Sequence, residues 1–243
     1  MKRSALSDTN PSYSNDAPRT ITEIVYRRLR LDIVWGVLAP GSALRSDDLR
    51  ERYGVGVSPL REALTRLMAE RLVTSVGQRG FRVADISNHD VIDVMETRLV
   101  IEKAALKASL EKGDIAWESR LVAAFHALSR IPIPRSQDDG SAEEWAECHR
   151  NFHMCLLSAC GSSWQMNLAS LLFDQAERFR LVRVRRIDKP KLTRDTMEEH
   201  KQIVDAALGR DFESSFAALE QHYRATSNEV LASIEHGKPL EDV

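Results

Sequence analysis

The architecture of the N-terminal part of the chain is set by residues 49–83, LRERYGVGVSPLREALTRLMAERLVTSVGQRGFRV. A short helix over 47–53 ends at the turn GVGVS, which leads into a second helix over 58–71. The segments LVTSV and FRVADI, separated by GQRG, predict a two-stranded hairpin. Ahead of them, apolar residues at spacings of three and four over 21–33 predict another helix.

Three helices followed by a hairpin predict a winged helix-turn-helix domain over residues 19–87. In such a domain one helix supports a second helix that enters the major groove of DNA, and we assign the second role to the helix over 58–71. Residues 19–87 hold 12 arginines, no lysine and eight acidic residues, a net charge of +4, whereas residues 88–243 carry −6. Arginine suits bidentate contacts to phosphate and guanine. We therefore expect the first domain to bind double-stranded DNA.

Candidate DNA contacts lie at the start and outer side of the 58–71 helix, on the hairpin and near the 47–53 helix. They are Arg45, Arg50, Ser58, Arg61, Thr65, Arg79, Gly80 and Arg82. The hairpin arginines are placed to reach a phosphate or the minor groove. For Arg61 the alternative is a solvated ion pair with an acidic neighbour such as Glu62.

Residues 40–83 resemble the N-terminal domain of the GntR family of bacterial transcription regulators. The matching residues are Pro59, Arg61, Glu62, Ala63 and Leu64, followed by Leu72-Val73 and Arg79-Gly80. Two positions differ, because Val57 stands where the family carries arginine and Gly56 stands where it carries serine. The resemblance therefore implies that one guanine-reading arginine is missing and that the operator differs from the common one. The residues left for base recognition are Ser58, Arg61 and either Arg45 or Arg50.

From Asn88 onward the chain reads almost entirely helical, with breaks at glycines and at two loops. The predicted helices span 89–112, 114–130, 141–159, 163–186, 191–209 and 211–235. No solenoid-type repeat is evident, so about six helices predict a bundle over 88–236 and a mainly α fold for the chain. Residues 1–18 are expected to be a disordered tail, and residues 237–243 a second tail.

Histidines in the second domain form a pattern that suits a metal. His149 and His153 are four residues apart and therefore share one helix face. His200 and His222 lie on the apolar sides of the last two predicted helices. A bundle can bring these imidazoles to one buried point, where neutral nitrogen ligands suit Zn(II) or Ni(II). The alternative is that each histidine is hydrogen-bonded in the core.

This second domain resembles the FCD ligand-binding domain of FadR-type GntR regulators. The family's D-x-x-x-H pattern falls on His149 and His153, and its later histidines fall on His200 and His222. The resemblance implies an all-helical domain in which one aspartate and three histidines hold a divalent metal. Because His149 replaces the aspartate, the site is less anionic than usual in the family.

Arginines of the bundle are candidates for binding an effector. The family's E-x-R motif matches Glu96 and Arg98, which makes Arg98 a candidate either for contact with an effector carboxylate or for coupling between the domains. Arg178, Arg180 and Arg183 lie on one long predicted helix, and any of them that faces inward can bind a second carboxylate. The alternative for these three is a solvated basic face. The resemblance alone implies a C4–C5 dicarboxylate such as glutarate or 2-hydroxyglutarate.

The predicted function is that of a metabolite-responsive transcriptional regulator and not that of an enzyme. The resemblance implies a repressor that a small carboxylate releases from DNA. It also implies a homodimer on a pseudo-palindromic operator. The alternatives are a regulator with a metal-free effector pocket and a metal-dependent hydrolase that carries a DNA-binding domain. The hydrolase needs a general base beside the metal, and HRNFH lacks the glutamate of the HExxH motif.

The chain shows no sign of a membrane or export signal. No apolar run approaches the ~18 residues that cross a bilayer, and the N-terminus lacks the secretory pattern. The three cysteines include no CxxC pair, which favours reduced thiols over a disulfide framework. We therefore expect a cytoplasmic protein with no membrane partner.

Overall fold

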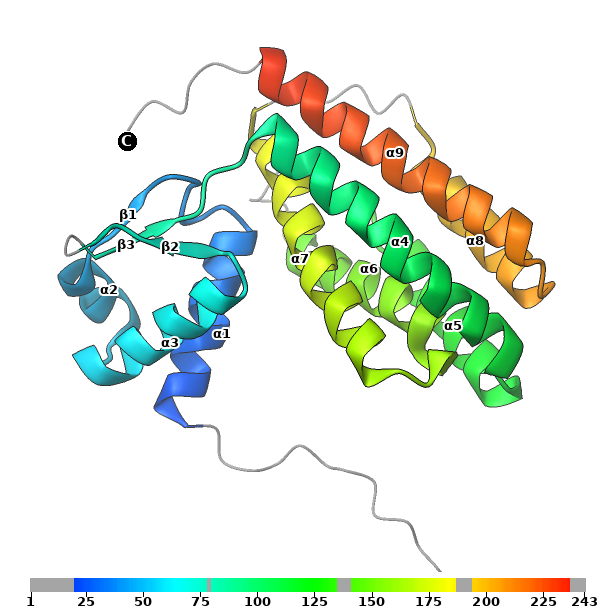
Figure 1. Cartoon of the computed structure of the whole chain (residues 1–243), viewed down its shortest axis with the longest axis horizontal. Coiled ribbons are helices and arrows are strands. Elements are labelled where there is room, and N and C mark those ends of the chain that lie inside the picture. The colour runs from blue at the N-terminus through cyan, green and yellow to red at the C-terminus, as the bar shows by residue number, and fades with distance from the viewer. Residues whose placement is uncertain (1–19, 78–79, 135–140, 187–193, 237–243) are drawn as a thin grey trace, which may run out of the picture.

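The computed structural model describes residues 20–77, 80–134, 141–186 and 194–236. Figure 1 shows a small N-terminal lobe of short helices and strands and a larger lobe of long helices. An extended segment, residues 84–87, connects the lobes. The mainly α fold, with a winged helix-turn-helix ahead of a helical bundle, is thus confirmed. The predicted tails 1–18 and 237–243 lie outside the described residues.

The N-terminal lobe packs its helices against a small sheet. Its described elements are α1 (Ile21–Val34), β1 (Ala43–Leu44), α2 (Ser46–Tyr53), α3 (Val57–Ala69), β2 (Val73–Ser75) and β3 (Phe81–Val83). β3 lies between β1 and β2 and is antiparallel to both, with Val73 opposite Val83 and Leu44 opposite Phe81. β2 and β3 form the predicted hairpin. β1 has no sequence signature, because two residues are too few for an alternating pattern and its pairing is a tertiary contact.

The helix ends of this lobe follow local capping. The side chain of Thr20 accepts a hydrogen bond of 3.2 Å from the backbone nitrogen of Glu23 and begins α1. Gly54 has φ +64°, in the left-handed region that glycine favours, and follows the end of α2. α3 begins at Val57, one residue before the predicted start. The apolar sides of these helices meet in a core that includes Val25, Leu29, Ile33, Leu49, Leu60, Leu64 and Leu67.

The described helices of the C-terminal lobe correspond to the predicted ones. They are α4 (Asn88–Lys112), α5 (Ile115–Ser129), α6 (Ala142–Leu157), α7 (Ser163–Arg186), α8 (Thr196–Leu208) and α9 (Phe212–His236), with a 3-10 turn η2 (Ser158–Cys160) after α6. α4 packs against α7 and α9, α5 against α6, and α8 against α9. α8 begins later than predicted, at Thr196, because Asp195 accepts a hydrogen bond of 3.0 Å from the backbone nitrogen of Glu198 and caps it.

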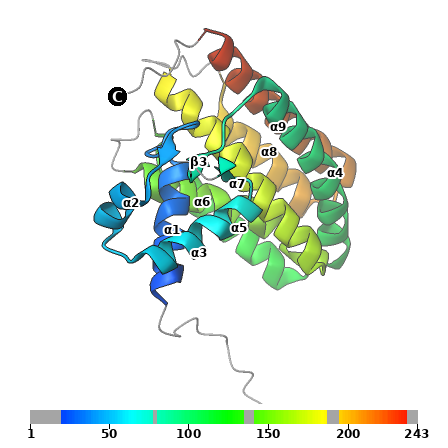
Figure 2. The same cartoon turned by 60° about the vertical axis from the view of Figure 1, so that its left-hand side comes forward.

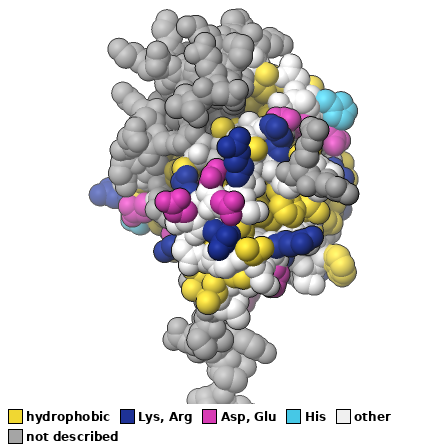
Figure 3. Space-filling model, turned by 90° about the vertical axis from the view of Figure 1, so that its left-hand side faces the viewer, with side chains coloured by type: hydrophobic (Ala, Val, Ile, Leu, Met, Phe, Trp, Pro, Cys, Tyr) yellow, Lys and Arg dark blue, Asp and Glu magenta, His cyan; other side chains and the backbone are white. Residues whose placement is uncertain are grey.

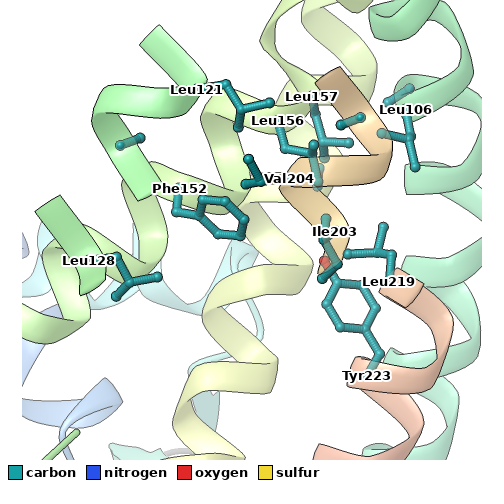
Figure 4. Close-up of a cluster of buried hydrophobic side chains, with 14 of the residues drawn as sticks. Leu106, Leu121, Leu128, Phe152, Leu156, Leu157, Ile203, Val204, Leu219 and Tyr223 are labelled. Carbon is teal, nitrogen blue, oxygen red and sulfur yellow. The ribbon is translucent and has the colours of Figure 1, made fainter. Parts of the chain in front are cut away.

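The bundle core lies where α4, α5, α6, α8 and α9 meet. Figure 4 shows their side chains gathered in one cluster, among them Phe152, Ile203 and Tyr223. Tyr223 is an aromatic core residue whose hydroxyl needs a polar partner. Its ring packs in the core, and its hydroxyl contacts the polar side chains of Glu102 and His153. None of the described helices is long and apolar enough to cross a membrane.

The lobes contact each other through α1 and α7, a contact that Figure 2 turns toward the viewer. Arg30 of α1 forms ion pairs with Asp174 of α7 and, at 3.1 Å, with Glu70. Arg150 of α6 also pairs with Asp174. Gln175 donates a hydrogen bond of 2.7 Å to the backbone oxygen of Glu70, which caps the C-terminus of α3. The end of α3 is therefore tied to the bundle.

Candidate metal centre and DNA-binding surface

The imidazoles of histidines from three helices meet at one point inside the bundle. They are His149 and His153 on α6, His200 on α8 and His222 on α9. One ring nitrogen of each lies within 4.8 Å of the others, and every ring is buried. The convergence expected from the sequence is thus observed among the described residues.

Neighbouring side chains determine which nitrogen of two rings points into the cluster. The hydroxyl of Tyr223 donates its proton to Oε2 of Glu102 at 2.6 Å, so it accepts one from Nδ1 of His153 at 3.2 Å. Nδ1 of His222 lies 2.8 Å from Oε2 of Glu199 and donates to it. In both rings Nε2 is left as a lone-pair donor, which is how outer partners prepare histidines for a metal.

The remaining nitrogens also fit a cation. Nε2 of His149 lies 3.1 Å from Nε2 of His153, close to the ~3.0–3.4 Å that separates two adjacent ligands at ~2.1 Å from one zinc ion. Two lone pairs at this distance repel unless a proton or a cation lies between them. Nε2 of His200 is buried and has no hydrogen-bond partner among the described residues. A divalent ion would satisfy all these nitrogens together.

Burial favours the neutral form of three of the histidines. It lowers the pKa of His153 and of His200 well below the ordinary value of 6.5, and the neighbouring imidazoles lower both further. The pKa of His222 is lowered mainly by burial, although Glu199 opposes the shift. Burial would raise the pKa of Glu199, but hydrogen bonds from His222 and Arg194 lower it to about 2. At neutral pH His153, His200 and His222 are therefore uncharged imidazoles beside an ionised carboxylate.

His149, His153 and His222 line a cavity of about 70 Å³ that also contains a buried arginine. Arg98 is 6% exposed and donates through Nε to Oε1 of Glu102 at 2.8 Å. Its Nη2 is buried and makes no hydrogen bond to a described residue. An unsatisfied buried donor costs roughly 1–3 kcal/mol, and an entering carboxylate can accept from it.

The exposed side chains of α3 fall into two groups, of which the first is occupied by α1. Nη1 of Arg66 lies 2.9 Å from Oε2 of Glu23, and the Arg66 guanidinium lies 3.8 Å from the ring centre of Tyr26. Glu62 accepts a hydrogen bond of 3.3 Å from the hydroxyl of Thr22. These contacts hold α3 against α1 and leave this edge of the helix unavailable.

The second group contains the predicted base-reading residues. Ser58, Arg61 and Thr65 are all exposed. The guanidinium of Arg61 has no ion pair or hydrogen bond with any residue that the structure describes, so the alternative of an ion pair with Glu62 is not seen there. The guanidinium is free to contact a phosphate or a base.

Two further candidate arginines lie around α2. Arg45 is exposed at the N-terminal cap of α2, and Nη1 of Arg50 lies 3.4 Å from a carboxylate oxygen of Asp47. Figure 3, which faces this lobe, shows Lys and Arg side chains scattered among acidic and apolar ones. On the part of this face that the structure describes, the basic side chains are thus dispersed among other types.

The wing carries the remaining candidates. The guanidinium of Arg82, on β3, donates to the backbone oxygen of Gly41. Gly80 has φ +100°, a backbone conformation that glycine alone adopts readily. Arg79 lies outside the described residues. The structure therefore places Arg82 against the base of the wing, where its exposed position still allows contact with DNA.

Comparison with known proteins decides the family. Residues 21–83 match the description "Bacterial regulatory proteins, gntR family", and residues 93–225 match the FCD domain. The chain belongs to the GntR family. It is a transcriptional regulator whose bundle is an FCD domain.

Full-length relatives of this GntR regulator support the same conclusion. The HTH-type transcriptional repressor GlaR of Escherichia coli (strain K12) is 35% identical over 205 residues, covering 84% of this chain and 93% of GlaR. The segments ERYGVGVSPLREAL, CHRNFH and VRR of this chain resemble the corresponding segments of GlaR. The HTH-type transcriptional regulator BphR of Paraburkholderia xenovorans (strain LB400) is 38% identical over 209 residues, covering 86% of this chain and 84% of BphR.

Solved structures show the same fold. E. coli McbR/YncC superimposes with a TM-score of 0.75 at 18% identity and covers 89% of this chain and 100% of its own. A putative GntR transcriptional regulator from Rhodococcus sp. RHA1 superimposes with a TM-score of 0.68 at 22% identity. The match covers 87% of this chain and 97% of the Rhodococcus chain. At these identities the likeness concerns the fold alone.

One arginine of the FCD cavity was missed by the sequence analysis. Arg194 lines the cavity and donates through Nε to Oε1 of Glu199 at 2.9 Å. Its Nη1 lies 3.4 Å from Glu229. Arg194 precedes α8, so helical periodicity gives no signal for it, and only its position six residues before His200 could have drawn attention to it.

The predicted effector arginines of α7 are placed differently from Arg98. Arg178 donates to the backbone oxygens of Ala84 and, at 3.1 Å, of Asp85, so its guanidinium holds the interdomain segment and does not line the cavity. The prediction that it faces the effector is not met, because the side of α7 that carries it packs on the linker. Arg180 and Arg183 lie on α7, but their side chains are outside the described residues.

Proposed function

We propose that this GntR regulator is a repressor that leaves its operator when a small carboxylate binds at a divalent metal in the FCD domain. The observation that carries the proposal is that buried imidazole nitrogens and the unsatisfied Nη2 of Arg98 share one cavity. The metal would be held by His149, His153, His200 and His222. When bound, the ion would supply a binding position for a carboxylate oxygen.

The ligand set favours zinc or nickel. Neutral imidazoles are preferred ligands of both ions. Because His149 stands where the family carries aspartate, the ligands contribute no charge of their own and leave the 2+ charge of the ion uncompensated. Among the nearby carboxylates, Glu102 is already paired with Arg98, and Glu199 with Arg194 and His222. Oε2 of Glu177 lies 3.4 Å from Nδ1 of His149 and can offset one of the two charges of the ion, which leaves one positive charge for the effector. This charge balance supports an anionic effector.

The effector class follows from two cationic positions. The metal and Nη2 of Arg98 can each bind one carboxylate, which supports a short dicarboxylate such as glutarate or 2-hydroxyglutarate. A cavity of about 70 Å³ suits a small acid. GlaR, the relative of similar length, is named a repressor, which supports repression here.

We further propose that the protein acts in the cytoplasm as a homodimer, without enzymatic activity, on a pseudo-palindromic operator. Ser58, Arg61 and Thr65 of α3 would contact bases. Arg45, Arg50, Arg79, Gly80 and Arg82 would contact the flanking backbone. Because arginine–phosphate contacts release counterions, operator affinity is expected to fall steeply with salt.

The metal is tested by elemental analysis after zinc loading and dialysis. Wild type is expected to retain about one ion per chain, and His153→Ala is expected to lose it. His126→Ala is the matched control, because His126 is exposed on α5, and it should retain the ion. Absence of bound metal from the wild type would remove the metal from the proposal.

The effector is tested by thermal unfolding and gel shift with glutarate and 2-hydroxyglutarate, with and without a chelator. A bound effector raises the unfolding temperature, and we expect this rise, and release of DNA, only in the metal-loaded protein. Arg98→Lys should retain the ion and lose the response. Stabilisation that survives the chelator would favour a metal-free pocket, and hydrolysis of esters or amides by the loaded protein would favour the hydrolase.

A further inference from the structure

Val57 is an apolar residue that is exposed at the start of α3. It is the first residue of α3, directly after the cap residue Gly56, and 54% of its surface is exposed. The core of this lobe is formed by other residues of α3, such as Leu60 and Leu64. Burial therefore does not account for a branched apolar residue at this position.

Val57 belongs to the uncovered ridge of α3. Residues four apart stack on one side of a helix, so Val57, Arg61 and Thr65 form one row, and all three are exposed. The opposite edge, with Glu62 and Arg66, is held by α1. The row is thus the part of the helix that a DNA duplex can reach.

The space beside this row is open. A groove of about 300 Å³ lies between α3 and the wing, and its lining includes Val57, Arg61, Gly77 and Gly80. Among the described residues on the wing side, Gly77 and Gly80 carry no side chain, and Ser75 and Phe81 complete the lining. The row and the wing therefore border one groove, with Val57 at the N-terminal end of the helix.

We propose that Val57 determines one base of the operator by contacting the C5-methyl group of a thymine. In the major groove that methyl group is the apolar feature of the base edges, and the other edges present hydrogen-bond donors and acceptors. The isopropyl group of Val57 makes no hydrogen bond, so it cannot read guanine as an arginine does. Recognition helices contact bases with their N-terminal residues, where Val57 lies. This inference rests on the proposed role of α3 in reading DNA.

The test begins by selecting binding sites for wild type and Val57→Ala from a random duplex library. Wild type should select thymine at one fixed position of each half-site, and Val57→Ala should lose the preference at that position alone. Replacing this thymine by deoxyuridine removes only the methyl group. It should weaken wild-type binding about three- to fivefold, the effect of one buried methyl group, and leave the affinity of Val57→Ala unchanged.

Two further variants complete the design. Val57→Arg should shift the preferred base at the same position to guanine. Val122→Ala is the matched control, because Val122 is an exposed valine on α5 of the bundle, and it should select the wild-type sequence. If no position of the selected site depends on Val57, or if deoxyuridine affects both proteins equally, the inference is wrong.

The same experiment separates this inference from the function on which it rests. Arg61→Ala should lose most operator affinity. If Arg61→Ala binds as tightly as wild type, α3 does not read DNA and both proposals fail. If Arg61→Ala loses binding while Val57→Ala keeps every base preference, only the role of Val57 is removed.

Discussion

At the scale of single residues, a hydroxyl group determines which nitrogen of His153 is available. Tyr223 can donate only one proton, and it donates this proton to Glu102, so His153 must carry its own proton on Nδ1. The ring is therefore prepared to bind a metal through Nε2. This arrangement explains why a core tyrosine and a buried carboxylate lie beside the histidines.

Tyr223→Phe is expected to lower zinc affinity about 10- to 100-fold, the usual effect of losing an outer-shell partner of a histidine ligand. The ring volume is preserved, so the fold should be unaffected. Competition with a chromophoric chelator measures the affinity. Tyr53→Phe removes a tyrosine hydroxyl that bonds Asp32 in the other lobe and should leave zinc binding unchanged. Equal affinity of Tyr223→Phe and wild type would contradict the assigned tautomer.

Glu199 links the stability of the metal-free protein to pH. Hydrogen bonds from His222 and Arg194 lower its folded-state pKa to about 2 from an ordinary 4.5. The contribution of the ionised Glu199 carboxylate to the free energy of unfolding is therefore complete above about pH 4.5. It is lost as the pH falls toward about 2.

Urea unfolding should accordingly show Glu199→Gln to be less stable than wild type by a constant amount at neutral pH. The difference should narrow as the pH falls below about 4.5. Glu198→Gln changes the preceding residue, whose carboxylate does not contact the histidines among the described contacts, and serves as the control. A difference that is the same at pH 3 and pH 7 would show that the ionised carboxylate is not the stabilising group.

At the scale of elements, glycine conformation determines where α2 ends and α3 can begin. Gly54 is left-handed, with φ +64°, and a Cβ atom added there would meet nothing within 4 Å. The cost of a side chain at this position is therefore conformational and not steric. The short turn that follows sets the angle at which α3 leaves α2.

Gly54→Ala is expected to destabilise the N-terminal lobe by roughly 1–2 kcal/mol, the cost of a left-handed conformation for a residue with a Cβ. Thermal unfolding of the variant and of the wild type measures this loss of stability. Gly209→Ala, at a helix end with φ −73°, needs no left-handed backbone and should cost less. The prediction is wrong if both substitutions have the same effect.

At the scale of the whole molecule, α7 connects the histidine cluster to the N-terminal lobe. Phe173 and Glu177 line the histidine cavity, and both also line the cleft between the lobes. Asp174 and Gln175, one or two residues away, contact Arg30 and Glu70 of the N-terminal lobe. An effector that displaces the cavity wall thus acts on the helix that holds α3.

Asp174→Asn should loosen this junction. Asp174 is 4% exposed and pairs with Arg30 and Arg150, so the variant removes the counter-charge of Arg150 and leaves Arg30 with Glu70 alone. Because both arginines are partly exposed, we expect a loss of roughly 1–3 kcal/mol, below the range for fully buried pairs. Faster proteolysis at residues 84–87 would report the loosening. The exposed Asp205→Asn is the control, and equal proteolysis of both variants would contradict the prediction.

The sequence by itself determined the elements and their chemistry. Spacings of three and four residues predict the helices, and the i, i+4 spacing of His149 and His153 places both on one face, because these are properties of a helix of 3.6 residues per turn. The motifs around Arg61 indicated the family. Such features depend on residues close together in the chain, which a sequence shows directly.

Only the tertiary structure decided which side chains meet. Packing of α8 and α9 on α6 brings His200 and His222 to His153, and the same packing turns Arg98 into the cavity but Arg178 onto the interdomain segment. Arg194 has no periodic position and becomes a site residue only through its contact with Glu199. These outcomes depend on how each helix is rotated about its axis in the bundle, which side-chain packing between distant segments determines and local sequence does not.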